Sequence, residues 1–286
     1  MQVNDKQILV IGSGIMGSGI TQVCVEAGYT VLIFDTKTDI SIKAKNNIKY
    51  FINRKVEKGL ILQEESENII DRIQICDDLL KAENATIVIE AATENISIKK
   101  EVFENLSKII NKDAIFASNT STISITLLGS FTDRPEKVIG MHFFIPAPLM
   151  KLIEIIPGIR TAEETIDTAF NFAKSLGKVP IKAPDSSAFI VNRLLLPMWN
   201  EAIFLVMEGN KPEDIDNAMK LGANLPMGPL ELADFAGLDT VLSVLKEMHK
   251  TFGEDKYRPC PLLIKMVQGN LLGKKTGKGF YNYEKK

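Results

Sequence analysis

The chain has 286 residues, of which 45% are hydrophobic and 24% are charged, and its formal net charge at pH 7 is −2. This composition is that of an ordinary globular protein, and the length is typical of about two domains. A slightly acidic chain has no global positive field, which argues against nucleic acid as a partner. No apolar run approaches membrane-spanning length and the first residues lack a signal-peptide pattern, so we expect a cytoplasmic protein without membrane contact.

The first part of the chain carries the pattern of a dinucleotide-binding unit. An apolar run at 7–11 leads into Gly12-Ser13-Gly14-Ile15-Met16-Gly17, then a helical pattern follows, and a second strand at 30–34 ends at Asp35. In this turn the first glycine permits a tight bend, the second lets the backbone approach a pyrophosphate, and the third lets helix and strand pack closely. The helix N-terminus offers free N–H groups to phosphates. The motif therefore predicts a dinucleotide, and Asp35 favours NAD over NADP, although Lys37 leaves room for NADP.

A helical pattern at 42–60 has a strongly basic surface. Its lysines and arginines outnumber its single acid, Glu57, and are Lys43, Lys45, Lys49, Arg54, Lys55 and Lys58. A charged face of this kind is commonly just a solvated helix face. The alternative is a patch that binds a phosphorylated substrate, which would be notable in a chain that is slightly acidic as a whole.

Polar side chains follow three successive apolar strands, expected at 86–92, 114–117 and 138–142. They are Glu94, Lys99, Asn119, Ser121 and His142. Ligands of open α/β sheets bind outside the carboxyl ends of the strands, so we expect these side chains to converge on one crevice. Helix capping is the alternative explanation for part of the segment 118–122.

His142 is the better candidate for a base among only two histidines. The other, His249, ends an amphipathic helix, where it is typical of a surface cap. If the reaction needs a base that titrates near neutrality, His142 is therefore the better choice. Glu154 lies inside the apolar strand 152–156, and a buried carboxylate needs a partner. A His142–Glu154 pair would be a base with its orienting acid; the alternative is a satisfied core histidine with Glu154 at an edge.

The sequence pattern changes near residues 184–187. From Ala188 onward it is almost wholly helical, with helices expected at 189–208, 213–221, 230–235, 238–252 and 262–268. We therefore predict an α/β protein: a Rossmann-type doubly wound sheet domain at 1–185 that binds NAD, followed by a smaller all-α domain at 186–286. Asn192 lies early in the first of these helices, where its amide needs a backbone or ligand partner. The apolar surface of the helical domain indicates a homodimer formed through it.

With these residues assembled, the chain resembles the 3-hydroxyacyl-CoA dehydrogenase family, and within it the bacterial 3-hydroxybutyryl-CoA dehydrogenases. The resemblance runs over nearly the whole length. Its motifs are Gly12–Gly17, Glu90–Asn95, Ser118–Ser121, Gly140–Pro148, Met150–Glu154, Phe189–Arg193, Glu213–Asp216, Pro226–Leu232, Gly237–Asp239 and Gly273–Tyr281.

The resemblance implies an enzyme that transfers hydride between NAD and the 3-position of a short-chain (S)-3-hydroxyacyl-CoA. His142 would be the general base, Glu154 would orient it, and Ser121 and Asn192 would position the substrate oxygen and thioester. Cofactor contacts beyond the glycine turn would come from Asp35, Glu94, Lys99, Ser121 and Lys275. Lys58 would be the position on the basic helix that meets the CoA phosphates. Such chemistry needs one base and one cofactor, and no metal.

The chain departs from the family pattern in two places. Ile145 stands where the family usually has Asn after His-Phe-Phe, and Ser187-Ala188 stands where it usually has Pro-Gly. The first change removes a polar contact on the cofactor side, and the second affects the start of the helix that carries Asn192. Both keep two alternatives open: a dehydrogenase of a free hydroxy or sugar acid on the same scaffold, and a dinucleotide-binding protein without catalysis.

Overall fold

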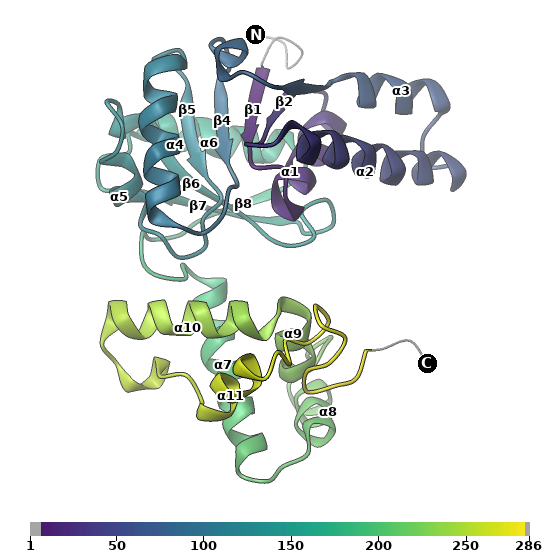
Figure 1. Ribbon diagram of the computed structural model, residues 1–286, viewed down its shortest axis with the longest axis vertical. Helices are drawn as coiled ribbons and strands as arrows, with labels where there is room; N and C mark the ends of the chain where they lie inside the picture. Colours follow the sequence, from purple (N-terminus) through teal and green to yellow (C-terminus); the bar gives the residue numbers. More distant parts are fainter. Residues whose placement is uncertain (1–6, 284–286) are drawn as a thin grey trace. The chain divides into compact units, whose positions relative to one another are not determined.

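Short strands rich in Ile, Val and Leu build a single sheet in the first part of the chain. The computed structural model describes residues 7–283, and the chain divides into two compact units, residues 1–185 and residues 186–286. The first unit contains the sheet and the second is helical (Figure 1). Within residues 7–283, no helix is both long enough and apolar enough to cross a membrane.

The sheet of the first unit has eight strands in the order β3-β2-β1-β4-β5-β6-β7-β8. They are β1 (Gln7–Ile11), β2 (Thr30–Phe34), β3 (Ile73–Cys76), β4 (Ile87–Glu90), β5 (Ile115–Ser118), β6 (Val138–Phe143), β7 (Leu152–Pro157) and β8 (Val179–Lys182). All neighbouring strands are parallel except β6 and β7. The strand order reverses at β1, which lies between β2 and β4. Open α/β sheets bind their ligands at such a switch point.

Helices cover both faces of this sheet (Figure 1). They are α1 (Ile15–Glu26), α2 (Thr38–Glu57), α3 (Gln63–Asp71), α4 (Ile96–Ile109), α5 (Ile125–Gly129) and α6 (Glu163–Ser175). Ile8 and Val10 of β1 share one core cluster with Ile20 of α1 and Phe172 of α6. The intervening Leu9 points to the other face and is also fully buried. Burial on both faces explains why the central strands read as unbroken apolar runs.

The helical unit consists of α7 (Val191–Met207), α8 (Pro212–Gly222), α9 (Pro229–Ala236), α10 (Leu238–Phe252) and α11 (Pro261–Gln268). Proline opens three of these helices, where its missing N–H costs nothing. The first helix begins two residues later than the sequence predicts, because Ala188 and Phe189 adopt φ angles of +64° and +50°, which no α-helix contains.

Two buried acids hold residues 280–281 onto this unit. The Asp216 carboxylate accepts hydrogen bonds from the N–H groups of Leu230 and Glu231 and from the Tyr281 hydroxyl. The Asp234 carboxylate accepts the backbone N–H groups of Phe280 and Tyr281 at 3.1 and 3.0 Å. These bonds satisfy backbone N–H groups in the first turn of α9. They also attach residues 280–281 to α8 and α9.

Candidate active site

The glycine turn of the first unit has the shape that a pyrophosphate requires. Gly12 has a φ of +94°, and a Cβ placed there would lie 2.6 Å from the Ala91 oxygen. A Cβ at Gly17 would lie 1.7 Å from the Gly12 oxygen, so any side chain would push helix α1 off the turn. Gly14, by contrast, has nothing within 4 Å of its Cβ position. The backbone is thus open at Gly14, and no side chain caps the N-terminus of α1. Together these features fit the phosphates of a dinucleotide.

The rest of the predicted nucleotide-binding segment is held in place around this turn. The Ser13 N–H donates to the Asp35 carboxylate at 2.8 Å, and the Ser13 and Ser41 hydroxyl oxygens are 2.8 Å apart. Asp35 follows β2 directly, beside the turn that follows β1. Of the two remaining motif residues, Ile15 is 77% exposed and Met16 packs on the core. The carboxylate that should receive the ribose is therefore fixed next to the turn.

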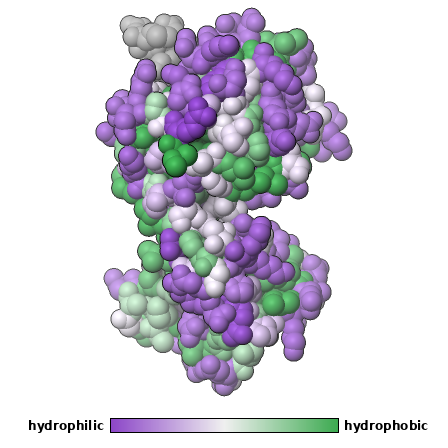
Figure 2. Space-filling view, turned by 90° about the vertical axis from the view of Figure 1, so that its left-hand side faces the viewer, coloured by the Kyte–Doolittle hydropathy of each residue, from purple (hydrophilic) through white to green (hydrophobic). Residues whose placement is uncertain are grey.

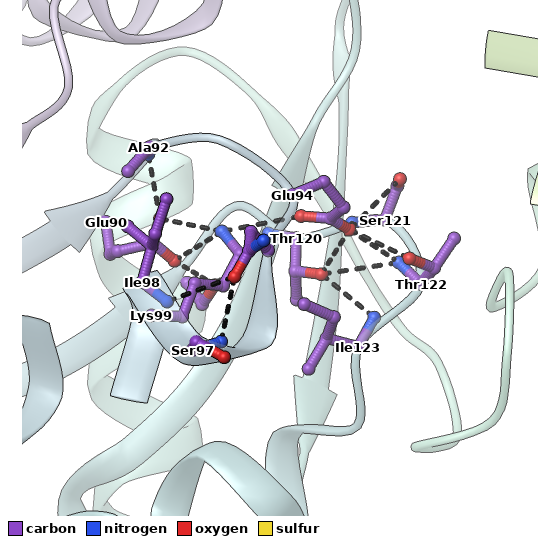
Figure 3. A network of polar contacts seen from close by, with 12 residues as sticks. Glu90, Ala92, Glu94, Ser97, Ile98, Lys99, Thr120, Ser121, Thr122 and Ile123 are labelled. Carbon is purple, nitrogen blue, oxygen red and sulfur yellow. Dashed lines mark hydrogen bonds and ion pairs between the residues drawn. The ribbon is translucent and has the colours of Figure 1, made fainter. Parts of the chain in front are cut away.

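Glu94 holds the segment that carries Ser121. Its Oε1 atom accepts the N–H groups of Ser121 and Thr122 at 2.9 and 3.1 Å, and the Thr120 hydroxyl donates to the same atom (Figure 3). Burial raises the pKa of Glu94, but the charge of Lys99 and the hydrogen bonds from residues 120–122 outweigh burial, so the pKa lies below its ordinary value. Glu94 is therefore a carboxylate at neutral pH, and its side chain is 38% exposed.

Lys99 lies beneath Glu94 rather than on the surface. Its side chain is 1% exposed, and its Nζ atom lies 2.7 and 2.8 Å from the two Glu90 oxygens and 3.4 Å from Glu94 Oε2. The family resemblance implies a direct cofactor contact for Lys99. Its burial between two acids favours an indirect role, in which it positions Glu94.

His142 and Glu154 come together because β6 and β7 are antiparallel. The two residues are directly opposite in the strand register, so their side chains lie on the same face of the sheet. His142 Nδ1 is 2.7 Å from Glu154 Oε2, and the two side chains are 8% and 0% exposed. The Phe144 ring lies 4.6 Å from the imidazole, measured between ring centroids. This is the geometry of a base with its orienting acid.

The remaining predicted residues have other settings. Asn119 accepts the Phe143 N–H at 2.8 Å and so fixes the end of β6. Lys58 is exposed and ends α2. Asn192 and Lys275 belong to the helical unit, where Asn192 is the second residue of α7 and Lys275 Nζ lies 2.9 Å from Asp239. Their part in the site stays a prediction, as does that of Lys58.

The sequence reasoning missed Glu90 and Ser118, which lie fully buried at the ends of β4 and β5. The Ser118 hydroxyl donates to Glu90 Oε2 at 2.6 Å. A signal was present, because Glu90 is a lone acid in an apolar strand, as Glu154 is. That pattern predicts a buried, partnered carboxylate in both places.

Comparison with known proteins identifies the family of this chain. Residues 7–186 match the 3-hydroxyacyl-CoA dehydrogenase NAD binding domain, and residues 189–283 match the C-terminal domain of the same family. A probable 3-hydroxybutyryl-CoA dehydrogenase of Bacillus subtilis is 49% identical over 282 residues, 98% of each chain. The 3-hydroxybutyryl-CoA dehydrogenase of Bradyrhizobium diazoefficiens is 46% identical over 279 residues, 97% of this chain and 95% of that protein.

Among solved structures, (S)-3-hydroxybutyryl-CoA dehydrogenase PaaH1 from Ralstonia eutropha superposes with a TM-score of 0.94 at 40% identity, covering 98% of this chain and 99% of that one. The fold and the site thus define an NAD-binding oxidoreductase with a Rossmann-type domain and a helical second unit. The chain belongs to the 3-hydroxyacyl-CoA dehydrogenase family. The resemblance, the fold class and the NAD cofactor inferred from the sequence are confirmed.

Proposed function

We propose that this protein is an NAD-dependent dehydrogenase of short-chain (S)-3-hydroxyacyl-CoA, interconverting compounds such as 3-hydroxybutyryl-CoA and acetoacetyl-CoA. The observation that carries the proposal is the buried His142–Glu154 pair, with Nδ1 and Oε2 2.7 Å apart. It lies on the sheet whose other strands end in the glycine turn and in the Ser121 segment. The names of the Bacillus and Bradyrhizobium relatives support the same substrate class.

The pair suits the removal of a proton from a secondary alcohol. An ionised Glu154 can only accept hydrogen bonds, so Nδ1–H of His142 donates to it and the lone pair of the imidazole resides on Nε2. Nε2 is then the atom that takes the proton of the substrate 3-hydroxyl. The charge that the ring gains is offset by the adjacent carboxylate, which is fully buried. Bound NAD⁺ would supply the hydride acceptor for the oxidation at the substrate C3 atom.

Other residues position the reactants. Glu94 fixes the Ser121 backbone, so the Ser121 hydroxyl has a defined place from which to orient the substrate oxygen. Glu94 Oε2 and the Asp35 carboxylate are the acceptors that this chain offers to the cofactor hydroxyl and amide groups, next to the open backbone at Gly14. From the family resemblance, Asn192 of the helical unit is proposed as a donor to the substrate thioester.

The basic surface of α2 is proposed to receive the CoA phosphates. Two of its six cations have structural partners, because Lys45 donates to the Ile73 oxygen and Lys55 pairs with Glu26. The four others are exposed: Lys43, Lys49, Arg54 and Lys58. A cluster of exposed cations in a slightly acidic chain is suited to a polyanionic substrate.

The helical unit is proposed to form a homodimer. It exposes large apolar side chains, among them Leu194, Leu205, Met207, Leu221 and Phe235. On the face seen in Figure 2, apolar areas interrupt a mostly hydrophilic surface. Apolar surface of this kind is stabilised when a second copy covers it.

The test of the proposed activity uses the two histidines of the chain. Purified protein with NADH and acetoacetyl-CoA should consume NADH, and His142→Gln should lower kcat by about 10³-fold, the range of general-base catalysis. His249→Gln is the matched control and should leave kcat unchanged, because His249 lies on α10, 3.9 Å from the exposed Asp255. Full activity of His142→Gln would remove the base from the mechanism. Turnover of free 3-hydroxybutyrate in place of the CoA ester would move the substrate to the free hydroxy acids.

A further inference from the structure

Glu90 is a buried acid that lies beneath the segment carrying Ser121. It ends β4 and is fully buried. Its two oxygens accept the Ala92 N–H at 2.7 Å, the Lys99 ammonium at 2.7 and 2.8 Å, and the Ser118 hydroxyl at 2.6 Å. A buried carboxylate with partners on every side is a fixed point of the structure, because any rearrangement leaves a charge or a donor unsatisfied.

The partners of Glu90 lead directly to the segment that carries Ser121. Lys99 lies between Glu90 and Glu94, and Glu94 Oε1 holds the N–H groups of Ser121 and Thr122 (Figure 3). The Ser118 hydroxyl donates to Glu90 and also accepts the Thr120 N–H at 3.2 Å. Two independent connections therefore run from Glu90 to residues 120–122, one through Lys99 and Glu94 and one through Ser118.

The charges explain why Glu90 is needed. Lys99 is the cation that the two acids share, and it is 2.7 Å from Glu90 but 3.4 Å from Glu94. Lys99 is therefore attracted more strongly to Glu90 than to Glu94. Glu94 Oε1 stays available for the hydrogen bonds from the Ser121 segment. Without the Glu90 charge, Lys99 would draw Glu94 toward itself and away from that segment.

We propose that Glu90 is a positioning residue for the active site: by binding both Lys99 and Ser118, it sets the place of the Glu94 carboxylate and of the Ser121 hydroxyl. The inference rests on the proposed dehydrogenase activity. It assigns to Glu90 an effect on turnover and cofactor affinity, in addition to any effect on stability.

The test is Glu90→Gln, which keeps the size of the side chain and removes its charge. We expect kcat with acetoacetyl-CoA to fall about tenfold and the Kd of NADH to rise severalfold, as small misplacements of positioning groups do. Glu90→Asp retains the charge and should recover most of the lost kcat. The matched control is Asp77→Asn, since Asp77 also follows a strand of this sheet and pairs with a lysine at 2.6 Å, but is exposed. The kcat and the NADH Kd of Asp77→Asn should equal those of the wild type.

The readouts separate positioning from a merely structural role. If Glu90→Gln lowers only the Tm while kcat and the NADH Kd stay at wild-type values, the proposal is overturned. If Glu90→Gln does not fold, Ser118→Ala becomes the deciding variant, and wild-type kcat and Kd in that variant overturn the proposal. Failure of the underlying function is distinguishable, because the wild-type protein would then show no turnover of acetoacetyl-CoA at all.

Discussion

At the scale of single residues, the chemistry depends on which charges are buried together. His142 and His249 each face an acid, but the His142–Glu154 pair is 8% and 0% exposed, whereas the acid near His249 is 96% exposed. Water screens the second pair and contributes little to the first. The same imidazole side chain is thus held in a buried pair in one place, where we propose that it acts as the base, and is a surface group in the other.

Glu154→Gln tests the orienting role directly. The amide keeps the shape of the side chain but carries no charge to offset the imidazolium, and its NH₂ group can force the opposite tautomer of His142. We expect kcat to fall by about 10²-fold or more, with a small change in the KM of the CoA substrate, as removal of an orienting carboxylate does elsewhere. Steady-state kinetics at neutral pH measure both quantities. If kcat stayed at the wild-type value and only the KM of the CoA substrate rose, Glu154 would act in substrate binding instead.

Ile145 lies close in the chain to His142, the proposed base, at a position where the family resemblance leads us to expect Asn. It follows Phe144 and is 47% exposed, so it presents an apolar surface where we expected an amide. Ile145→Asn should tighten NADH binding by about 1 kcal/mol, the value of one added hydrogen bond. Titration of NADH fluorescence gives the Kd. Leu149→Asn, 76% exposed in the same loop, is the control and should leave the Kd unchanged.

At the scale of elements, the segment that carries Ser121 is held from both ends. Glu94 binds residues 120–122, and Asp185 accepts the Ser124 hydroxyl and the N–H groups of Ile125 and Thr126 at the start of α5. Asp185 is also the last residue of the first unit. The end of the sheet unit and the Ser121 segment are therefore tied to the same short helix.

Asp185→Ala should loosen this attachment. The variant loses three hydrogen bonds to a carboxylate, two of which satisfy N–H groups of the first turn of α5. We expect a loss of about 1–2 kcal/mol in the free energy of unfolding, the usual cost of removing a capping side chain. Urea denaturation followed by circular dichroism measures it. Asp167→Ala, on the exposed face of α6, serves as control, and an equal loss there would contradict the capping role.

Glu94 should also make the stability of the first unit depend on pH. Its pKa is lower in the folded protein than the ordinary value of 4.5, so the folded state binds its proton less tightly than the unfolded state. The stabilisation is therefore fully present above the ordinary pKa and is lost as the pH falls through the lowered one. Denaturation of wild type and Glu94→Gln at several acidic pH values should give a steeper loss for the wild type. Parallel curves would contradict it.

Some elements escaped prediction for a local reason. The segment 61–77 contains α3 and the edge strand β3, neither of which the sequence indicates. β3 has only four residues and buries its two ends. α3 buries only three of its residues. Neither element is long enough to show a periodic pattern of apolar residues in the sequence. The helix expected at 42–60 begins at Thr38 and ends at Glu57. Its early start was missed because the first turn is mostly polar and its one apolar residue, Ile40, is exposed.

At the scale of the whole molecule, the features predicted correctly are those that depend on short stretches of neighbouring residues. The glycine turn, Asp35 and the apolar strands each follow from a few neighbouring residues, and the family follows from motifs that keep their order. The contacts between Glu90 and Lys99 and between Asp185 and α5 depend on strand order and on side-chain packing, which no local pattern contains. The His142–Glu154 contact needed the antiparallel register of β6 and β7, although the lone buried acid pointed to it.

The assembly of the molecule gives the largest-scale prediction. Leu194 and Leu205 lie eleven positions apart on α7, which places them within about 20° on the same side of the helix, and they are 70% and 37% exposed. If a second copy covers this face, Leu194→Glu/Leu205→Glu places two charges in an apolar interface and should convert dimers to monomers. Light scattering coupled to size-exclusion chromatography measures the mass. Leu60→Glu, 68% exposed on the sheet unit, is the matched control and should leave the mass unchanged. A double variant that stays dimeric would locate the interface elsewhere, and a wild type that is monomeric would remove the dimer itself.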